Sequence, residues 1–255
     1  MTTKNHLMSN ILTMTHRNLL KTLHNPGSLS DVIIEPVIFT LLFGYLFGGV
    51  IAGSVHAYLP MLVSGILVQS ILNAASGSGQ QLREDINAGV FARFKTLPIS
   101  PIAPLAGQLV GDSFRLLLSG VAALTTAFLM GWRPTVGLPT LVAVLLLAIF
   151  IGWSTSWIFA LVGLMAKNAE LIGSLSMIII LVLTFLSNAF IPTKTLPRFI
   201  QTIVKLNPVS LTITAIRTIL RTGNWSNNAT MVLISGGIII LIFMPLTVFI
   251  YQQRD

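Results

Sequence analysis

The stretch "DVIIEPVIFTLLFGYLFGGVI", residues 31–51, decides the fold class of this chain. After Asp31 and Glu35 it carries no further charge, and Val, Ile, Leu and Phe dominate its composition. A run of about 20 apolar residues is long enough to cross the hydrocarbon core of a bilayer as an α-helix. The stretch therefore predicts a transmembrane helix.

Five more segments have the same character, and the composition of the whole chain agrees with them. The mean hydropathy is +0.86, and 255 residues hold only 15 Lys+Arg and 7 Asp+Glu, too few charges to cover a water-soluble domain of this size. In lipid, helices satisfy their own backbone hydrogen bonds. We predict an all-α integral membrane protein, a single permease domain over 1–255, with six transmembrane helices at 31–51, 59–81, 104–130, 137–165, 170–191 and 229–250.

Several chemistries lack the residues that they need. The chain has no cysteine, which excludes disulfides and thiol nucleophiles. No Gly is followed by Lys, so the phosphate-binding loop of an ATPase is missing. Its few histidines lack metal-ligand spacing, and no cluster resembles the active site of a membrane enzyme. We expect no metal, no cofactor and no enzyme activity on this chain. The cations are scattered at the ends of apolar runs, which favours lipid over nucleic acid.

The segment before the first span predicts an amphipathic helix over 5–24. At 100° per residue, its polar side chains gather on one side, and that side is too charged to cross a membrane. We expect an interfacial helix along the inner membrane surface, with its cations near anionic headgroups. The polar side comprises His6, Asn10, Thr13, Arg17, Lys21 and His24.

The segment 197–221 predicts two short outer helices, which begin at Pro197 and Pro208. Neither is long enough to span, so both should re-enter the outer leaflet or cap the bundle. Arg217 and Arg221 share a polar stripe on the second helix. Two interpretations stand: they line an exit for substrate, or they snorkel to lipid phosphates.

Polar residues inside the spans are candidates for a transport path. Gln69, Asn73 and Ser76 lie in the second span, where such residues serve either tight helix packing or a water-filled route. Asp112 and Arg115 are three residues apart in the third span and are predicted to pair. The intramembrane ionisable set is completed by Glu35, which, like Asp31, we expect near a membrane boundary.

The segment 82–98, "LREDINAGVFARFKTLP", predicts a short helix between the second and third spans. Acids near its start and cations near its end suit the helix dipole. Phe91, Phe94 and Leu97 are three residues apart on one side. Such a cluster is buried against a partner protein or lies on lipid, and the pattern alone favours neither.

Three stretches together resemble the permeases of ABC type-2 exporters, most closely the daunorubicin-resistance type. "NAGVFARFKTLPISP" (87–101) is similar to that family's cytoplasmic loop, with its Gly, aromatic, Arg and Leu-Pro. "SNAFIPTKTLPRFIQTIVKLNPVSLTITAIR" (187–217) resembles the family's outer segment, and 31–53 resembles its first span. Ala92 departs from the family pattern, where an acid is frequent, and Glu35 stands where an uncharged residue is common.

The resemblance implies an architecture and a set of partners. The 82–98 helix would be the coupling helix of an ATP-driven exporter, inserted into a separate ATP-binding subunit that holds ATP and Mg. A second permease copy, membrane lipid and a small amphiphilic, drug-like or lipid-like substrate are the other expected partners. Both termini would be cytoplasmic in a multi-pass protein of the cell membrane. The implied coupling residues are Glu84, Asp85, Phe91, Arg93, Phe94, Lys95, Leu97 and Pro98.

The alternative function is that of a secondary transporter driven by an ion gradient. In that case the intramembrane charged residues would couple proton or sodium movement to transport. Such carriers usually need carboxylates deep in the bundle. The depth of these side chains therefore bears on the choice.

Overall fold

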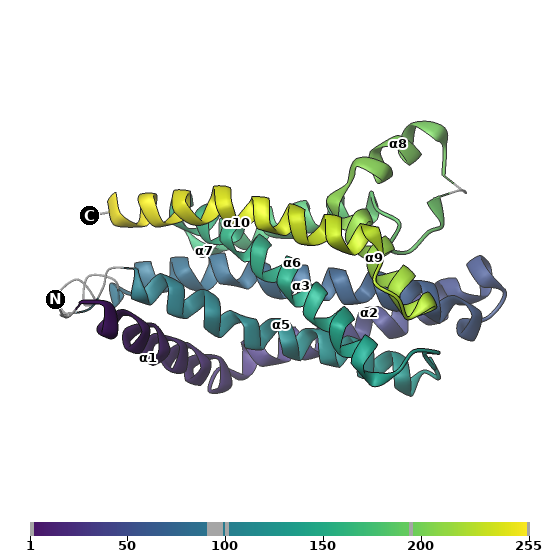
Figure 1. The fold of residues 1–255 in the computed structure, drawn as a ribbon, viewed down its shortest axis with the longest axis horizontal. Helices are drawn as coiled ribbons and strands as arrows, with labels where there is room; N and C mark the ends of the chain where they lie inside the picture. The colour runs from purple at the N-terminus through teal and green to yellow at the C-terminus, as the bar shows by residue number, and fades with distance from the viewer. Residues whose placement is uncertain (1–2, 91–98, 100–101, 194–195, 254–255) are drawn as a thin grey trace.

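The computed structural model describes residues 3–90, 99, 102–193 and 196–253, and within these ranges all regular structure is helical. Figure 1 shows an elongated bundle in which the start of α1 and the end of α10 lie at the same end, while α8 projects from the other end. The helices are α1 Thr3–Leu23, α2 Pro26–Ala52, α3 Val55–Asn87, α5 Ala103–Leu129, α6 Leu138–Met165, α7 Ala169–Phe185, α8 Arg198–Leu206, α9 Pro208–Thr222 and α10 Asn227–Gln253.

The predicted all-α membrane fold is confirmed. Five helices, α2, α3, α5, α6 and α10, are long and apolar enough to cross a membrane. A sixth candidate arises if α8 and α9, which are bent by 79° relative to one another, count as one broken span. These numbers refer to the part of the chain that the structure describes.

The fifth predicted span is shorter than expected. We predicted 170–191, but α7 ends at Phe185 and has only 17 residues. α7 ends here because the Asn207 side chain binds its last carbonyl groups. The amide of Asn207 donates to Leu183 O at 2.6 Å and to Leu186 O at 2.8 Å. The chain then turns back, and the Phe190 ring stacks on Phe43 with centroids 4.1 Å apart. Residues 186–191 therefore pack as a turn against α2 and do not extend the span.

The two short helices predicted over 197–221 form where the sequence predicts them, as α8 and α9. Asn207 caps α9, because its Oδ1 accepts a hydrogen bond from Val209 N at 2.8 Å, and Pro208 occupies the first turn. The helix ends at Gly223, whose φ of 73° is a left-handed conformation that favours glycine. These caps fix where α9 begins and ends.

α3 is the central helix and packs against α2, α5, α6, α7 and α9. Its small residues make this possible, since lipid supplies little hydrophobic force between helices and close backbone contact replaces it. At the crossing with α6, a side chain added at Gly163 would overlap the carbonyl oxygen of Gly79. Residues 82–87 belong to α3 itself, so the first part of the predicted 82–98 coupling helix is the last part of this span.

α1 lies lengthwise against the first half of α5. The contact uses Gly107 and Gly111, one turn apart: a side chain added at either glycine would collide with Met14 or Asn18 of α1. The opposite side of α1 is apolar and exposed, with Met8 and Leu12 each more than half accessible. The predicted helix forms, and its apolar side is suited to lipid.

Candidate functional site

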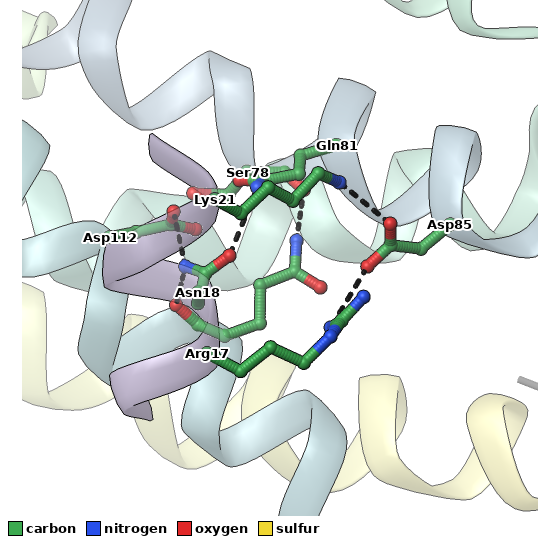
Figure 2. Close-up of polar contacts among 8 residues, drawn as sticks. Arg17, Asn18, Lys21, Ser78, Gln81, Asp85 and Asp112 are labelled. Atoms are coloured by element: carbon green, nitrogen blue, oxygen red, sulfur yellow. Dashed lines mark hydrogen bonds and ion pairs between the residues drawn. The ribbon is translucent and has the colours of Figure 1, made fainter. Parts of the chain in front are cut away.

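Polar side chains from three helices meet where α1, α3 and α5 touch, and we call this cluster the α1–α3–α5 junction (Figure 2). Asn18 is its centre, because its Nδ2 donates to Gln108 O at 3.1 Å and to Asp112 Oδ1 at 3.3 Å. Its own Oδ1 accepts from Gln81 Nε2 at 2.9 Å. The junction comprises Arg17, Asn18, Lys21, Ser78, Gln81, Asp85, Gln108 and Asp112.

Asp85 forms the charged part of this junction. Its Oδ1 lies 2.6 Å from Lys21 Nζ, and its Oδ2 lies 3.6 Å from Arg17 Nη1. The Asp85 side chain is only 9% exposed, whereas the two cations are 31% and 40% exposed. Arg17 and Lys21 thus ion-pair with the end of α3, and the expectation that the α1 cations lie near lipid headgroups stays a prediction.

The predicted pair of Asp112 and Arg115 does not form. Asp112 is fully buried and turns to Asn18, and no nitrogen of Arg115 lies within 4.0 Å of a carboxylate among the described residues. The Arg115 guanidinium instead lies over Gly77, where the missing side chain leaves room for it. Helix spacing allowed the pair, but an Asn on a neighbouring helix provided a better-placed donor for the acid.

Arg115 also lines a polar cavity of about 210 Å³ between α1, α2, α3 and α5. Each of the four helices contributes one charged side chain to the lining: Lys21 from α1, Asp31 from α2, Glu84 from α3 and Arg115 from α5. Its lining residues are Lys21, Thr22, Asn25, Asp31, Gly77, Gln80, Gln81, Glu84 and Arg115.

Glu35 of α2 contacts α3, the central helix. Its Oε1 accepts a hydrogen bond from Asn73 Nδ2, so a residue predicted for a transport path contacts a residue predicted as an ionisable group. Asn73 precedes the α3 terminus at Asn87 by 14 residues, which corresponds to about 21 Å along the helix. Glu35 follows the start of the candidate span at Leu29 by six residues, and its expected position near a membrane boundary stays a prediction.

The two other path candidates are packed inside the bundle. Gln69 is 6% exposed and Ser76 is 9% exposed, and the Ser76 hydroxyl donates to Asn73 O at 2.7 Å. Both side chains are therefore buried between helices, and their place on a transport path stays a prediction. Asn73 differs, since it is only half-buried.

Arg217 points into the bundle. Its guanidinium donates to Ser64 Oγ at 3.2 Å, Met61 O at 3.2 Å and Asn188 O at 3.0 Å. Snorkelling to phosphates is therefore wrong for Arg217, since three acceptors of the turn and of α3 hold it. Arg221, one turn further, is exposed. The two arginines therefore have different surroundings: Arg217 is bonded to groups inside the bundle, whereas Arg221 is exposed.

Only two of the predicted coupling residues, Glu84 and Asp85, lie within the residues that the structure describes. Phe91, Arg93, Phe94, Lys95, Leu97 and Pro98 lie outside the described residues. Of the remaining two, Glu84 is exposed, whereas Asp85 faces α1. The sequence analysis missed Asn18, Gln81 and Gln108, although the Gly107 and Gly111 spacing marks the surface of α5 that receives α1.

Comparison with known proteins agrees with this architecture. The ABC-2 type transporter family matches residues 9–221. The chain is 36% identical to the daunorubicin resistance ABC transporter permease protein DrrB1 of Streptomyces coeruleorubidus, over 95% of this chain and 87% of that protein. It is 28% identical to a putative transport permease, ycf38, of Porphyra purpurea, over 91% and 80% of the two chains.

A third relative covers less of the chain. The doxorubicin resistance ABC transporter permease protein DrrB of Mycobacterium tuberculosis is 28% identical over 56% of this chain and 53% of its own length. With the family matched over most of the sequence and the helical bundle in place, this chain is a multi-pass membrane protein that belongs to the ABC-2 type transporter family of permease subunits.

Proposed function

We propose that this chain forms the translocation path of an ATP-driven exporter for small amphiphilic compounds and that a separate ATP-binding subunit drives it. The names of the drug-resistance relatives support the substrate class, and family membership supports the motor subunit. The chain itself has no Gly-Lys pair for a phosphate-binding loop. ATP and Mg are therefore assigned to the partner, and both termini to the cytoplasm.

The observation that carries the proposal is the continuity of α3. The helix runs from Val55 to Asn87, so the start of the 82–98 segment and the central span form one body. Asp85 joins this body to α1 through Lys21 and Arg17. A partner subunit that displaces the 82–98 segment would move α3 and α1 together. We propose that this motion opens the translocation path first to one side of the membrane and then to the other.

The chain is proposed to work as a dimer of permeases. Apolar side chains remain exposed along α7 and α10 and on part of α2, and lipid or a second copy would cover them.

Affinity purification tests the proposed assembly. The chain, extracted from its own cells in mild detergent, should co-purify with a soluble P-loop ATP-binding subunit. The reconstituted complex should move a fluorescent amphiphile only when ATP and Mg are present. Transport by the chain alone, driven by a proton or sodium gradient, would instead identify a secondary transporter.

A further inference from the structure

Glu35 is an acid on the membrane-spanning helix α2. Its side chain is half-buried, and the bond that the structure gives it comes from the neutral amide of Asn73. No Lys, Arg or His nitrogen lies within 4.0 Å of it in the described part of the chain. Asp85, in contrast, has two cations. A carboxylate in this position is costly unless a positive charge comes close to it.

Glu35 belongs to a stripe along one side of α2. At 100° per residue, Glu35, Ile38, Leu42 and Tyr45 fall within about 40° of Asp31. Ile38, Leu42 and Tyr45 are 52%, 43% and 67% exposed. The stripe thus begins with two acids and continues as an accessible apolar surface that ends in an aromatic ring.

The acidic end of the stripe connects to the polar cavity, because Asp31 also lines that cavity. Inside the cavity the charges balance, with Asp31 and Glu84 facing Lys21 and Arg115. One turn further along α2, Glu35 has no Lys, Arg or His nitrogen within 4.0 Å among the residues that the structure describes. Gln81 adds an unsatisfied acceptor to the cavity wall, because it is 9% exposed and its Oε1 has no hydrogen-bond donor.

We propose that Glu35 is the counter-ion for the cationic group of an amphiphilic substrate, whose apolar body lies along Ile38, Leu42 and Tyr45. This inference rests on the proposed transport function and narrows it to amphiphilic organic cations. Asn73 orients the carboxylate, and the polar cavity admits the charged group. A charge-assisted contact of this kind changes affinity by about tenfold or more.

A matched pair of substrates tests the inference. Trimethylammonium-diphenylhexatriene carries a permanent positive charge, and its hydroxymethyl analogue shares the fluorophore without the charge. The chain reconstituted with its ATP-binding subunit should export both, and Glu35→Gln should reduce export of the cation about tenfold while the neutral analogue changes less than twofold. Glu35→Asp, which keeps the charge, should retain the preference for the cation.

Glu170→Gln is the matched control, since Glu170 is an exposed acid at the start of α7, away from the stripe. It should leave both rates unchanged. Equal loss of the two substrates in Glu35→Gln, or no loss of either, would overturn the role of counter-ion while the transport function stands. A change in the pH dependence of export without a change in discrimination would also overturn it. Failure of the unmodified complex to export either compound would overturn the proposed function itself.

Discussion

Lys21 Nζ lies 2.6 Å from Asp85 Oδ1, so α1 is tied to the end of the central span by an ion pair that is largely shielded on the acid side. Arg17 adds a second cation at 3.6 Å. These contacts connect α1 to the end of α3. The first prediction concerns this pair.

Asp85→Asn should destabilise the protein by about 1–2 kcal/mol. The value lies below that of a fully buried ion pair because both cations are about a third exposed and remain solvated. Thermal unfolding in detergent measures it, with Glu84→Gln as the control, since Glu84 is adjacent, exposed and outside both ion pairs. In a double-mutant cycle, Lys21→Gln should add little once Asp85 is changed. Full additivity would show that the pair contributes nothing.

Gly107→Ala should loosen α1 from the bundle. The new methyl group would overlap Met14, and overpacking at a tight helix contact typically costs about 1–3 kcal/mol. Limited proteolysis should then cut α1 faster than in the unmodified protein. Gly237→Ala is the control, because open space surrounds Gly237. Identical cleavage of the two variants would mean that α1 does not depend on this contact.

Arg217→Lys should destabilise the outer end of the bundle by about 2 kcal/mol. A lysine cannot maintain the directed bonds to Ser64, Met61 and Asn188 together, because its ammonium lacks the planar fork of a guanidinium. Arg221→Lys should have an effect below about 0.5 kcal/mol, because its side chain is exposed. Thermal unfolding in detergent compares the two. Equal effects would indicate that the inward bonds of Arg217 do not matter for stability.

The sequence predicted the helices well and their contacts less well, for physical reasons. Hydropathy reports on the solvent around a segment, and proline marks where a helix can begin; together they located α2, α3, α5, α6, α9 and α10. They do not report on a competing donor from a distant helix. Asn207 ends α7 early, and Asn18 takes Asp112 away from Arg115. In both cases an amide more than 20 residues away decided the outcome, which no local spacing reveals.

The candidate site was predicted in its residue types and only partly in its arrangement. Glu35, Asn73, Asp85 and Arg217 were all singled out, yet the sequence did not show that Glu35 meets Asn73 or that Asp85 meets Lys21. Both contacts depend on how α2 and α1 pack against α3. That packing follows from small residues such as Gly79 and Gly107, whose partners become known only in three dimensions.

The most direct test of the account measures ATP hydrolysis and export in the same reconstituted complex, with Phe91→Ala and Phe94→Ala combined in the 82–98 segment. We predict that the variant inserts normally and that export falls by about tenfold or more while ATP hydrolysis continues or loses its dependence on substrate. Phe199→Ala combined with Phe249→Ala, at two exposed positions, should export normally. Unchanged export by the Phe91 and Phe94 variant would contradict the claim that a motor subunit drives this bundle through that segment.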